Sequence, residues 1–273
     1  MLEGLIAPLS YAFMQRGLLA ALMVGVLCSI IGCYVVLRSM AFLGDALAHA
    51  VLPGVAIAYL LHGSLTLGAL VAAVIVALGI GYFTREGTIK EDTAIGILFA
   101  AALSLGVALI SAIRSNNYAT DLTHILFGNV LGVSSGDLWL TAGLGAAILG
   151  VVLACYRPFL VISFDPVLAA TLRLPAAKLR YLMLILLALT IVVSMQTVGV
   201  GLAAAMLVTP AATAYLLTRR LPAMMALSAG VGAFSSIVGL YLSYYANISS
   251  GAAIVLVATA FFVAAFALSP KKR

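Results

Sequence analysis

Charged residues are scarce in this chain. Aspartate, glutamate, lysine and arginine together make up 8% of its 273 residues, whereas soluble domains carry about 25%. Hydrophobic residues account for 65%, and the mean hydropathy is +1.25. This composition excludes an ordinary soluble domain. It predicts a polytopic membrane protein with one transmembrane domain over residues 1–273.

Disulfides, an ATPase motif and a nucleic-acid-binding surface are also missing. The three cysteines, Cys28, Cys33 and Cys155, are odd in number and lie in apolar stretches, which argues against a disulfide framework. No G-x-x-x-x-G-K-[ST] sequence occurs, so the chain cannot itself supply a P-loop ATPase. The net charge of +6 comes from basic residues at the ends of apolar segments, where they indicate membrane topology rather than nucleic-acid binding.

Long apolar stretches fill the sequence, and they predict an all-α transmembrane bundle of about eight or nine spans. The stretches cover about residues 17–37, 45–61, 65–83, 93–113, 137–156, 181–198, 200–217, 222–242 and 251–268. Residues 1–16 are broken by Gly4, Pro8 and Arg16, and we expect an interfacial helix there. The charge cluster at 86–92 is interpreted as a solvated loop.

The positions of the basic residues predict the orientation of these spans. Cytoplasmic connections are enriched in lysine and arginine. The segments expected in the cytoplasm are Arg38, 85–92, 157–180, 218–220 and 271–273. The loops at 62–64, 114–136 and 243–250 are then expected outside, together with the N-terminus.

An acidic residue and a histidine interrupt the second apolar stretch. Asp45 and His49 are four residues apart, so on a helix they share one face. Pro53 has no N–H, and its presence is expected to leave the carbonyl of His49 without its helical donor. A charged side chain near the bilayer centre costs roughly 2.5–3.5 kcal/mol on insertion scales. We therefore interpret Asp45 and His49 as a metal site.

Structural roles for these residues remain open. Asp45 could be the N-cap of the second span, since aspartate is a preferred cap residue. His49 could be an interior histidine that bonds a neighbouring carbonyl. His62 and His124 fall on predicted outside loops, where surface or docking roles are favoured over metal binding.

Two later features are candidates for lining a transport pathway. Pro210 is expected to free the carbonyl of Met206 and to kink its span, although packing explains a proline there equally well. Met195, Gln196 and Thr197 are polar or polarizable residues near the end of another span, and a packing role is equally open for them.

Asp165 and Pro166 predict the start of a short helix in the connection at 157–180. Aspartate is a preferred N-cap, and proline is favoured at the first helical position.

Several stretches resemble the membrane permeases of manganese, zinc and iron ABC importers. They are Gly17–Ala21, Gly32–Arg38, Ala41–Gly54, Ser163–Pro166, Thr197–Gly201 and Leu207–Ala214. The resemblance follows the family's order over nearly the whole chain. One departure follows Pro166: the family usually carries a glycine near Arg173, where this chain has Thr171-Leu172-Arg173-Leu174-Pro175.

The resemblance implies a multi-pass permease of the bacterial plasma (inner) membrane that is not itself an enzyme. Its expected partners are a second copy of the chain, cytoplasmic ATP-binding subunits, an extracytoplasmic metal-binding protein and lipid, but no nucleic acid. Asp45 and His49 of two protomers would meet near the two-fold axis and bind the transported ion, most readily manganese, with zinc and iron as alternatives. No cofactor would be bound permanently. Phe164, Asp165 and Pro166 would couple the permease to the ATPase.

Two other function classes remain alternatives. One is a stand-alone secondary metal-ion transporter or channel driven by an ion gradient, and the other is a membrane scaffold or sensor. A proton-coupled carrier would be expected to have more than one buried carboxylate per chain, and only Asp45 qualifies. Basic residues at Arg173, Lys178 and Arg180 flank the segment that begins at Asp165, and this pattern favours a docked partner.

Overall fold

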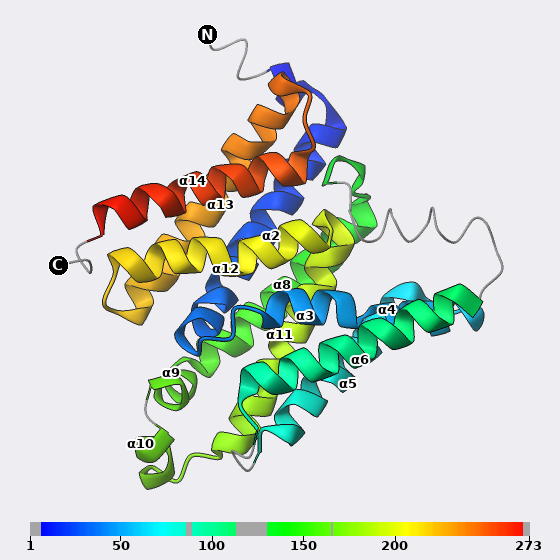
Figure 1. The fold of residues 1–273 in the computed structure, drawn as a ribbon. Helices are drawn as coiled ribbons and strands as arrows, with labels where there is room; N and C mark the ends of the chain where they lie inside the picture. The colour runs from blue at the N-terminus through cyan, green and yellow to red at the C-terminus, as the bar shows by residue number, and fades with distance from the viewer. Residues whose placement is uncertain (1–6, 86–88, 113–129, 165, 270–273) are drawn as a thin grey trace. The chain divides into compact units, whose positions relative to one another are not determined.

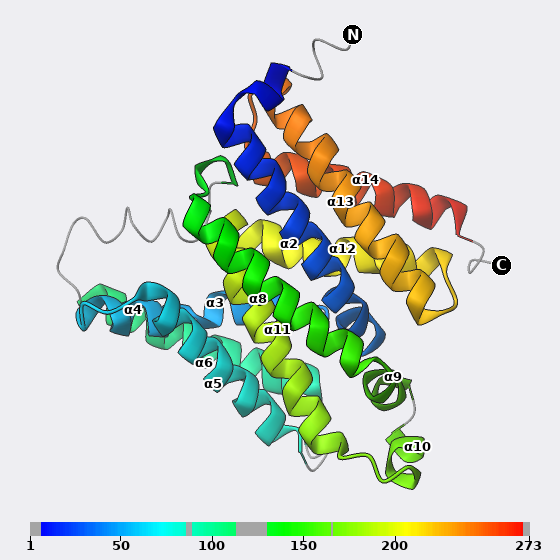
Figure 2. The same ribbon diagram turned by 180° about the vertical axis from the view of Figure 1, so that it is seen from behind.

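The computed structural model describes residues 7–85, 89–112, 130–164 and 166–269, and every regular element in these ranges is helical (Figures 1 and 2). The elements are η1 (Ala7–Ser10), α2 (Ala12–Leu37), α3 (Leu43–Ala50), α4 (Leu52–Leu60), α5 (Leu65–Phe83), α6 (Glu91–Ala112), η2 (Val130–Gly132), α8 (Ser135–Ala154), α9 (Tyr156–Phe164), α10 (Pro166–Thr171), α11 (Ala176–Val198), α12 (Val200–Leu217), α13 (Leu221–Ala246) and α14 (Ser250–Leu268).

Nine helical stretches among the described residues are long and apolar enough to cross a membrane, with α3 and α4 counted together as one. The predicted all-α bundle of eight or nine spans is therefore confirmed. The largest differences from the predicted boundaries are that α2 begins at Ala12 rather than at residue 17, that α11 begins at Ala176 rather than at residue 181, and that α13 ends at Ala246 rather than at residue 242. Arg16 and Arg180 lie inside α2 and α11, respectively. A helix can continue through an arginine near the membrane surface, because the long side chain extends toward water.

The chain forms two compact units. The first contains residues 1–36, 124–147 and 193–273, and the second contains residues 37–123 and 148–192. In the first unit α12, α13 and α14 pack on one another, and in the second α3 and α4 pack on α5 and α6. Asp45, His49 and Phe164 all belong to the second unit.

Hydroxyl groups and glycines join α2 to α13 in the first unit. The Ser228 hydroxyl donates to the carbonyl of Ser29, and the Ser236 hydroxyl donates to the carbonyl of Ala21, each at 2.9 Å. The partners are eight residues apart on each helix but in opposite order along the chain, so the helices are antiparallel. Between the two bonds a Cβ on Gly25 would lie 3.0 Å from the carbonyl oxygen of Gly232. Small residues therefore allow the two backbones to approach closely.

The second unit holds α4 against α5 through another pair of glycines. A Cβ on Gly54 would lie 2.6 Å from the Cβ of Ala72, and a Cβ on Gly68 would lie 2.6 Å from the Cβ of Ala58. Each would also press against the backbone of the other glycine. Between α3 and α4, Val51 keeps right-handed helical dihedral angles of φ −74° and ψ −19°. The packing of α4 on α5 therefore also fixes the helix that carries Asp45 and His49.

Candidate functional site

Asp45 and His49 lie one turn apart on α3, as their spacing predicts. The Nδ1 atom of His49 lies 3.5 Å from a carboxylate oxygen of Asp45 and 3.0 Å from the backbone carbonyl oxygen of Asp45. The side chain of His49 is 31% exposed to solvent, and that of Asp45 is 50% exposed. Both groups are thus accessible at the surface of a single chain rather than sealed in its core.

The contact with the Asp45 carbonyl orients the imidazole ring of His49. A carbonyl oxygen only accepts hydrogen bonds, so we infer that Nδ1 carries the proton and donates it. The lone pair of the neutral ring then lies on Nε2. A histidine that binds a metal is commonly held in this way, with the second ring nitrogen bonded to an oxygen. The ring of Phe99 on α6 packs edge-on against His49, with the centroids 5.9 Å apart.

The structure excludes one alternative at this site and contradicts one expectation. Phe42, not Asp45, is the N-cap of α3, so Asp45 lies inside the first turn of the helix. The carbonyl of His49 is not left without a donor, because the backbone N–H of Val51 bonds to it at the end of α3. Two candidate side-chain ligands, Asp45 and His49, therefore remain. Among the described residues no group of three or more His, Cys, Asp or Glu side chains could hold a metal ion.

The predicted coupling segment contains two short helices in the second unit. Helix α9 ends at Phe164, whose side chain is 60% exposed. Helix α10 begins at Pro166, where the sequence predicts a helix start. Asp165 lies outside the described residues, as does His124, while His62 is exposed in the turn after α4. An exposed phenylalanine at the end of a short helix is a chemically suitable contact for another protein.

A left-handed residue ends α10. The N–H of Leu174 donates to the carbonyl of Ala169 at 3.0 Å, and Arg173 has a φ of 52°. This is the Schellman arrangement of a helix C-terminus, in which glycine is the usual left-handed residue. Arg173 therefore adopts a left-handed backbone conformation that glycine commonly occupies at the end of a helix. The structure accommodates the arginine with the same backbone geometry that a glycine would adopt.

The candidate pathway residues lie in the first unit. Met195 and Thr197 are buried, and Gln196 is partly exposed. The hydroxyl of Thr197 donates to carbonyls of its own helix, those of Val193 and Ser194. Pro210 is buried within α12. A role for these four residues in lining a pathway stays a prediction.

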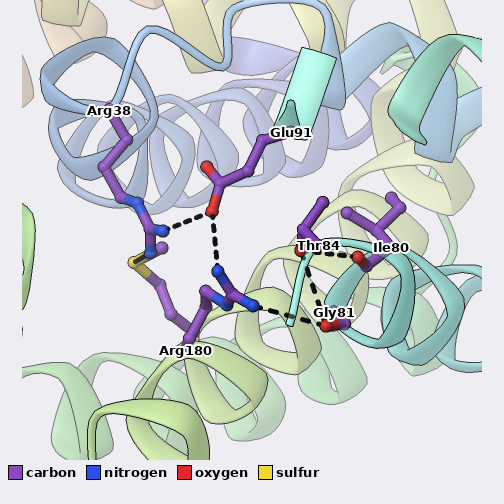
Figure 3. Close-up of polar contacts among 7 residues, drawn as sticks. Arg38, Ile80, Gly81, Thr84, Glu91 and Arg180 are labelled. Carbon is purple, nitrogen blue, oxygen red and sulfur yellow. Dashed lines mark hydrogen bonds and ion pairs between the residues drawn. The ribbon is translucent and has the colours of Figure 1, made fainter. Parts of the chain in front are cut away.

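A charged cluster that sequence reasoning missed lies in the second unit (Figure 3). One carboxylate oxygen of Glu91, at the start of α6, lies 2.6 Å from Arg38 and 3.6 Å from Arg180. Arg180 also donates to the carbonyl of Gly81 at 3.4 Å. The interpretation of 86–92 as a solvated loop is therefore wrong for Glu91. The sequence does contain one signal for this cluster: each of three predicted spans has a charged residue near the end that is assigned to the cytoplasmic side.

The model of the ABC 3 transport family matches residues 10–269. A protein of Halalkalibacterium halodurans described as "Manganese transport system membrane protein MntC" is 51% identical, over 97% of this chain and 90% of that protein. A protein of Haemophilus influenzae described as "Probable iron transport system membrane protein" is 43% identical, over 98% of both chains.

A solved structure has the same fold over the full length. It is titled "PsaBC from Streptococcus pneumoniae in complex with Fab", and the matching chain is 42% identical with a TM-score of 0.86. The match covers 100% of this chain and 98% of that one. The arrangement of helices described above is thus shared with an experimentally determined protein.

Proposed function

Because the chain belongs to the ABC 3 transport family, we propose that it is the permease subunit of an ATP-driven importer of divalent transition-metal ions. Family membership over residues 10–269 is the observation that carries this proposal, and it favours an importer subunit over a stand-alone carrier or a scaffold. The sequence has no P-loop, so ATP hydrolysis belongs to a separate chain.

Manganese is the proposed ion. The relative that is 51% identical is named as a manganese transport protein. Iron is the second candidate, because the relative that is 43% identical is named as a probable iron transport protein. Donors of the type offered by Asp45 and His49, one oxygen and one nitrogen, suit both ions and also zinc, so the names of the relatives decide the order.

We propose that Asp45 and His49 form the ion site together with the same residues of a second copy. One chain offers two side-chain ligands, and the described residues include no group of three or more. Both side chains remain partly exposed in the single chain and can therefore face a partner. Two copies related by a two-fold axis would supply two carboxylates and two imidazoles. This proposal makes the functional unit a homodimer.

The segment of α9 and α10 is the proposed contact with the cytoplasmic ATP-binding subunit. Its support is the exposed Phe164 and the helix start at Pro166. A metal-binding protein on the opposite side of the membrane is the proposed donor of the ion. Closure of the ATP-binding subunits would then reach the membrane helices through the short helix α10.

Replacing Phe164 by alanine is expected to weaken the complex with the ATP-binding subunit and to leave the permease folded. The side chain is 60% exposed, so its loss removes little internal packing. Co-purification of the ATP-binding subunit from detergent measures the effect. Trp139→Ala on α8 is the matched control, since this aromatic side chain is 80% exposed but lies outside the segment. Equal retention of the subunit by both variants would remove Phe164 from the interface.

The proposed orientation in the bacterial inner membrane has the C-terminus in the cytoplasm. Within the second unit, Arg38 at the end of α2 meets Glu91 at the start of α6 and Arg180 near the start of α11. In the first unit the Ser269 hydroxyl after α14 donates to the carbonyl of Leu216 near the end of α12. In each unit, therefore, helix ends that are assigned to the same side of the membrane contact one another. This agreement supports the assignment of the helix ends within each unit to one side of the membrane, and the basic residues are the reason for placing that side in the cytoplasm.

Cysteine labelling in intact cells tests the orientation. A cysteine at Ser249, exposed before α14, is expected to react with an impermeant maleimide, and a cysteine at Arg220, exposed before α13, is not. Alanine at the three native cysteines prevents background labelling. Both sites should react after permeabilisation, which confirms that each is accessible. Labelling of the Arg220 position in intact cells would overturn the orientation.

A further inference from the structure

Three arginines converge on a pocket in the second unit, away from Asp45 and His49. The cavity has a volume of about 230 Å³ and is lined by Arg38, Arg85 and Arg180, together with aliphatic side chains of α9, α10 and the start of α11. None of the described residues that line it carries a carboxylate. Drug-sized ligands occupy pockets of about 300–1,000 Å³. The cavity is therefore suited to one small charged group.

Positive charge around this pocket is only partly compensated. Glu91 pairs with both Arg38 and Arg180, so among the described residues one carboxylate serves two guanidinium groups (Figure 3). Arg85, exposed in the turn after α5, adds a third positive charge. Burial lowers the pKa of Arg38 from its usual value, Glu91 opposes this effect, and the neighbouring charge of Arg180 adds to it. An anion in the pocket would relieve this repulsion.

One buried donor in the pocket lining is unsatisfied. The Nε atom of Arg180 is buried and has no hydrogen-bond acceptor within the described part of the chain. A buried donor without an acceptor costs about 1–3 kcal/mol. The two terminal nitrogens of this guanidinium, Nη1 and Nη2, contact Glu91 and the carbonyl of Gly81, respectively. Nε is thus the donor left for a bound group.

The start of α11 also faces this pocket. Ala176 and Ala177, the first two residues of the 23-residue helix, line the cavity. The first N–H groups of a helix have no acceptor within that helix, and they commonly bind phosphate or sulfate oxygens. The N–H of Ala176 already donates to the carbonyl of Leu174 at 2.8 Å, so the contribution of this helix end rests on the N–H groups that follow it. The pocket therefore combines guanidinium groups, an unsatisfied Nε–H and a helix N-terminus, all of which favour oxygen anions.

We propose that this pocket binds a phosphate-type oxyanion at the cytoplasmic end of the helices, supplied either by the headgroup of an anionic phospholipid or by free phosphate. Planar guanidinium groups bind phosphate oxygens in pairs, and basic pockets between membrane helices are suited to lipid headgroups. The bound group bridges the ends of α2 and α5 to the start of α11. Because α9 and α10 contribute to the same wall, its occupancy also stabilises the segment that precedes α11.

Ligand-dependent melting of the full-length permease in a neutral detergent tests the proposal. Phosphatidylglycerol, phosphatidylcholine and inorganic phosphate are titrated separately. We expect phosphatidylglycerol or phosphate to raise the melting temperature of the wild type, whereas phosphatidylcholine does not. A shift with phosphatidylglycerol alone identifies a lipid as the source, and a shift with phosphate identifies the free anion. Native mass spectrometry counts the bound groups.

Substitutions separate this pocket from general surface charge. Arg85→Gln removes one charge without breaking the ion pairs of Glu91, and it is expected to weaken anion binding about tenfold. Arg220→Gln also removes one exposed charge, but in the first unit, and it should bind as the wild type does. The proposal is overturned if no anion raises the melting temperature, if phosphatidylcholine acts equally, or if both variants lose the same affinity.

Discussion

Uptake of manganese is expected to be abolished by Asp45→Asn and by His49→Ala, while the permease still folds and assembles. Asp45→Asn keeps the size of the side chain and removes its charge. His49→Ala removes the ring nitrogen that is free to bind an ion. Both side chains are partly exposed, so neither change opens a cavity in the core. Uptake of radiolabelled manganese by a transport-deficient host, normalised to permease in the membrane, measures the effect.

A substitution at another histidine, His62, is the matched control for this experiment. His62→Asn changes an exposed histidine after α4 that has a φ of 52°, a conformation that asparagine tolerates. It is expected to leave uptake unchanged. The double variant should lose no more uptake than either single one, because ligands of one site act as a unit. Normal uptake by well-assembled Asp45→Asn and His49→Ala variants would show that the pair is structural.

The second large effect is expected at the contact between α4 and α5. In Gly54→Val the new side chain meets the backbone of Gly68 and the Cβ of Ala72. Backbone atoms cannot rotate out of the way, so the helices must separate, at a cost of at least about 1–3 kcal/mol. We expect a large loss of monodisperse permease on detergent size-exclusion chromatography. Because α4 continues directly from α3, uptake should fall with it.

Gly96→Val is the matched control for this substitution. Gly96 lies within α6 in the same unit, and a Cβ there meets no atom within 4 Å. Both variants introduce the same β-branched residue into a helix, so the intrinsic change in helix propensity is similar. If Gly96→Val lowers the yield as much as Gly54→Val does, propensity rather than helix contact explains the loss.

The spans could be predicted because each depends on local composition. An apolar stretch of about 20 residues specifies a membrane helix whatever surrounds it. The boundaries were less predictable, as Arg16 and Arg180 demonstrate: both lie inside helices although they interrupt apolar stretches. The spacing of Asp45 and His49 likewise predicted their proximity, since four residues make one helical turn.

Contacts between distant segments could not be predicted in this way. The carboxylate of Glu91 pairs with arginines that lie 53 and 89 positions away in the sequence. In the sequence it is only one member of a polar run. The bond from Val51 to the carbonyl of His49 was missed for a different reason. The absence of an N–H in Pro53 shows which donor is lost, but it does not show which neighbouring donor turns to replace it.

The antiparallel pair of α2 and α13 has a consequence for the membrane itself. Each helix has 26 residues, and at 1.5 Å per residue this gives a length of about 39 Å, against about 30 Å of hydrocarbon. The excess is accommodated by tilting or by extension of the ends into the headgroup region. Since two hydroxyl–carbonyl bonds tie the helices together, they must tilt as a pair. Bilayer thickness therefore acts on both helices at once, and a thinner membrane increases the inclination of the pair.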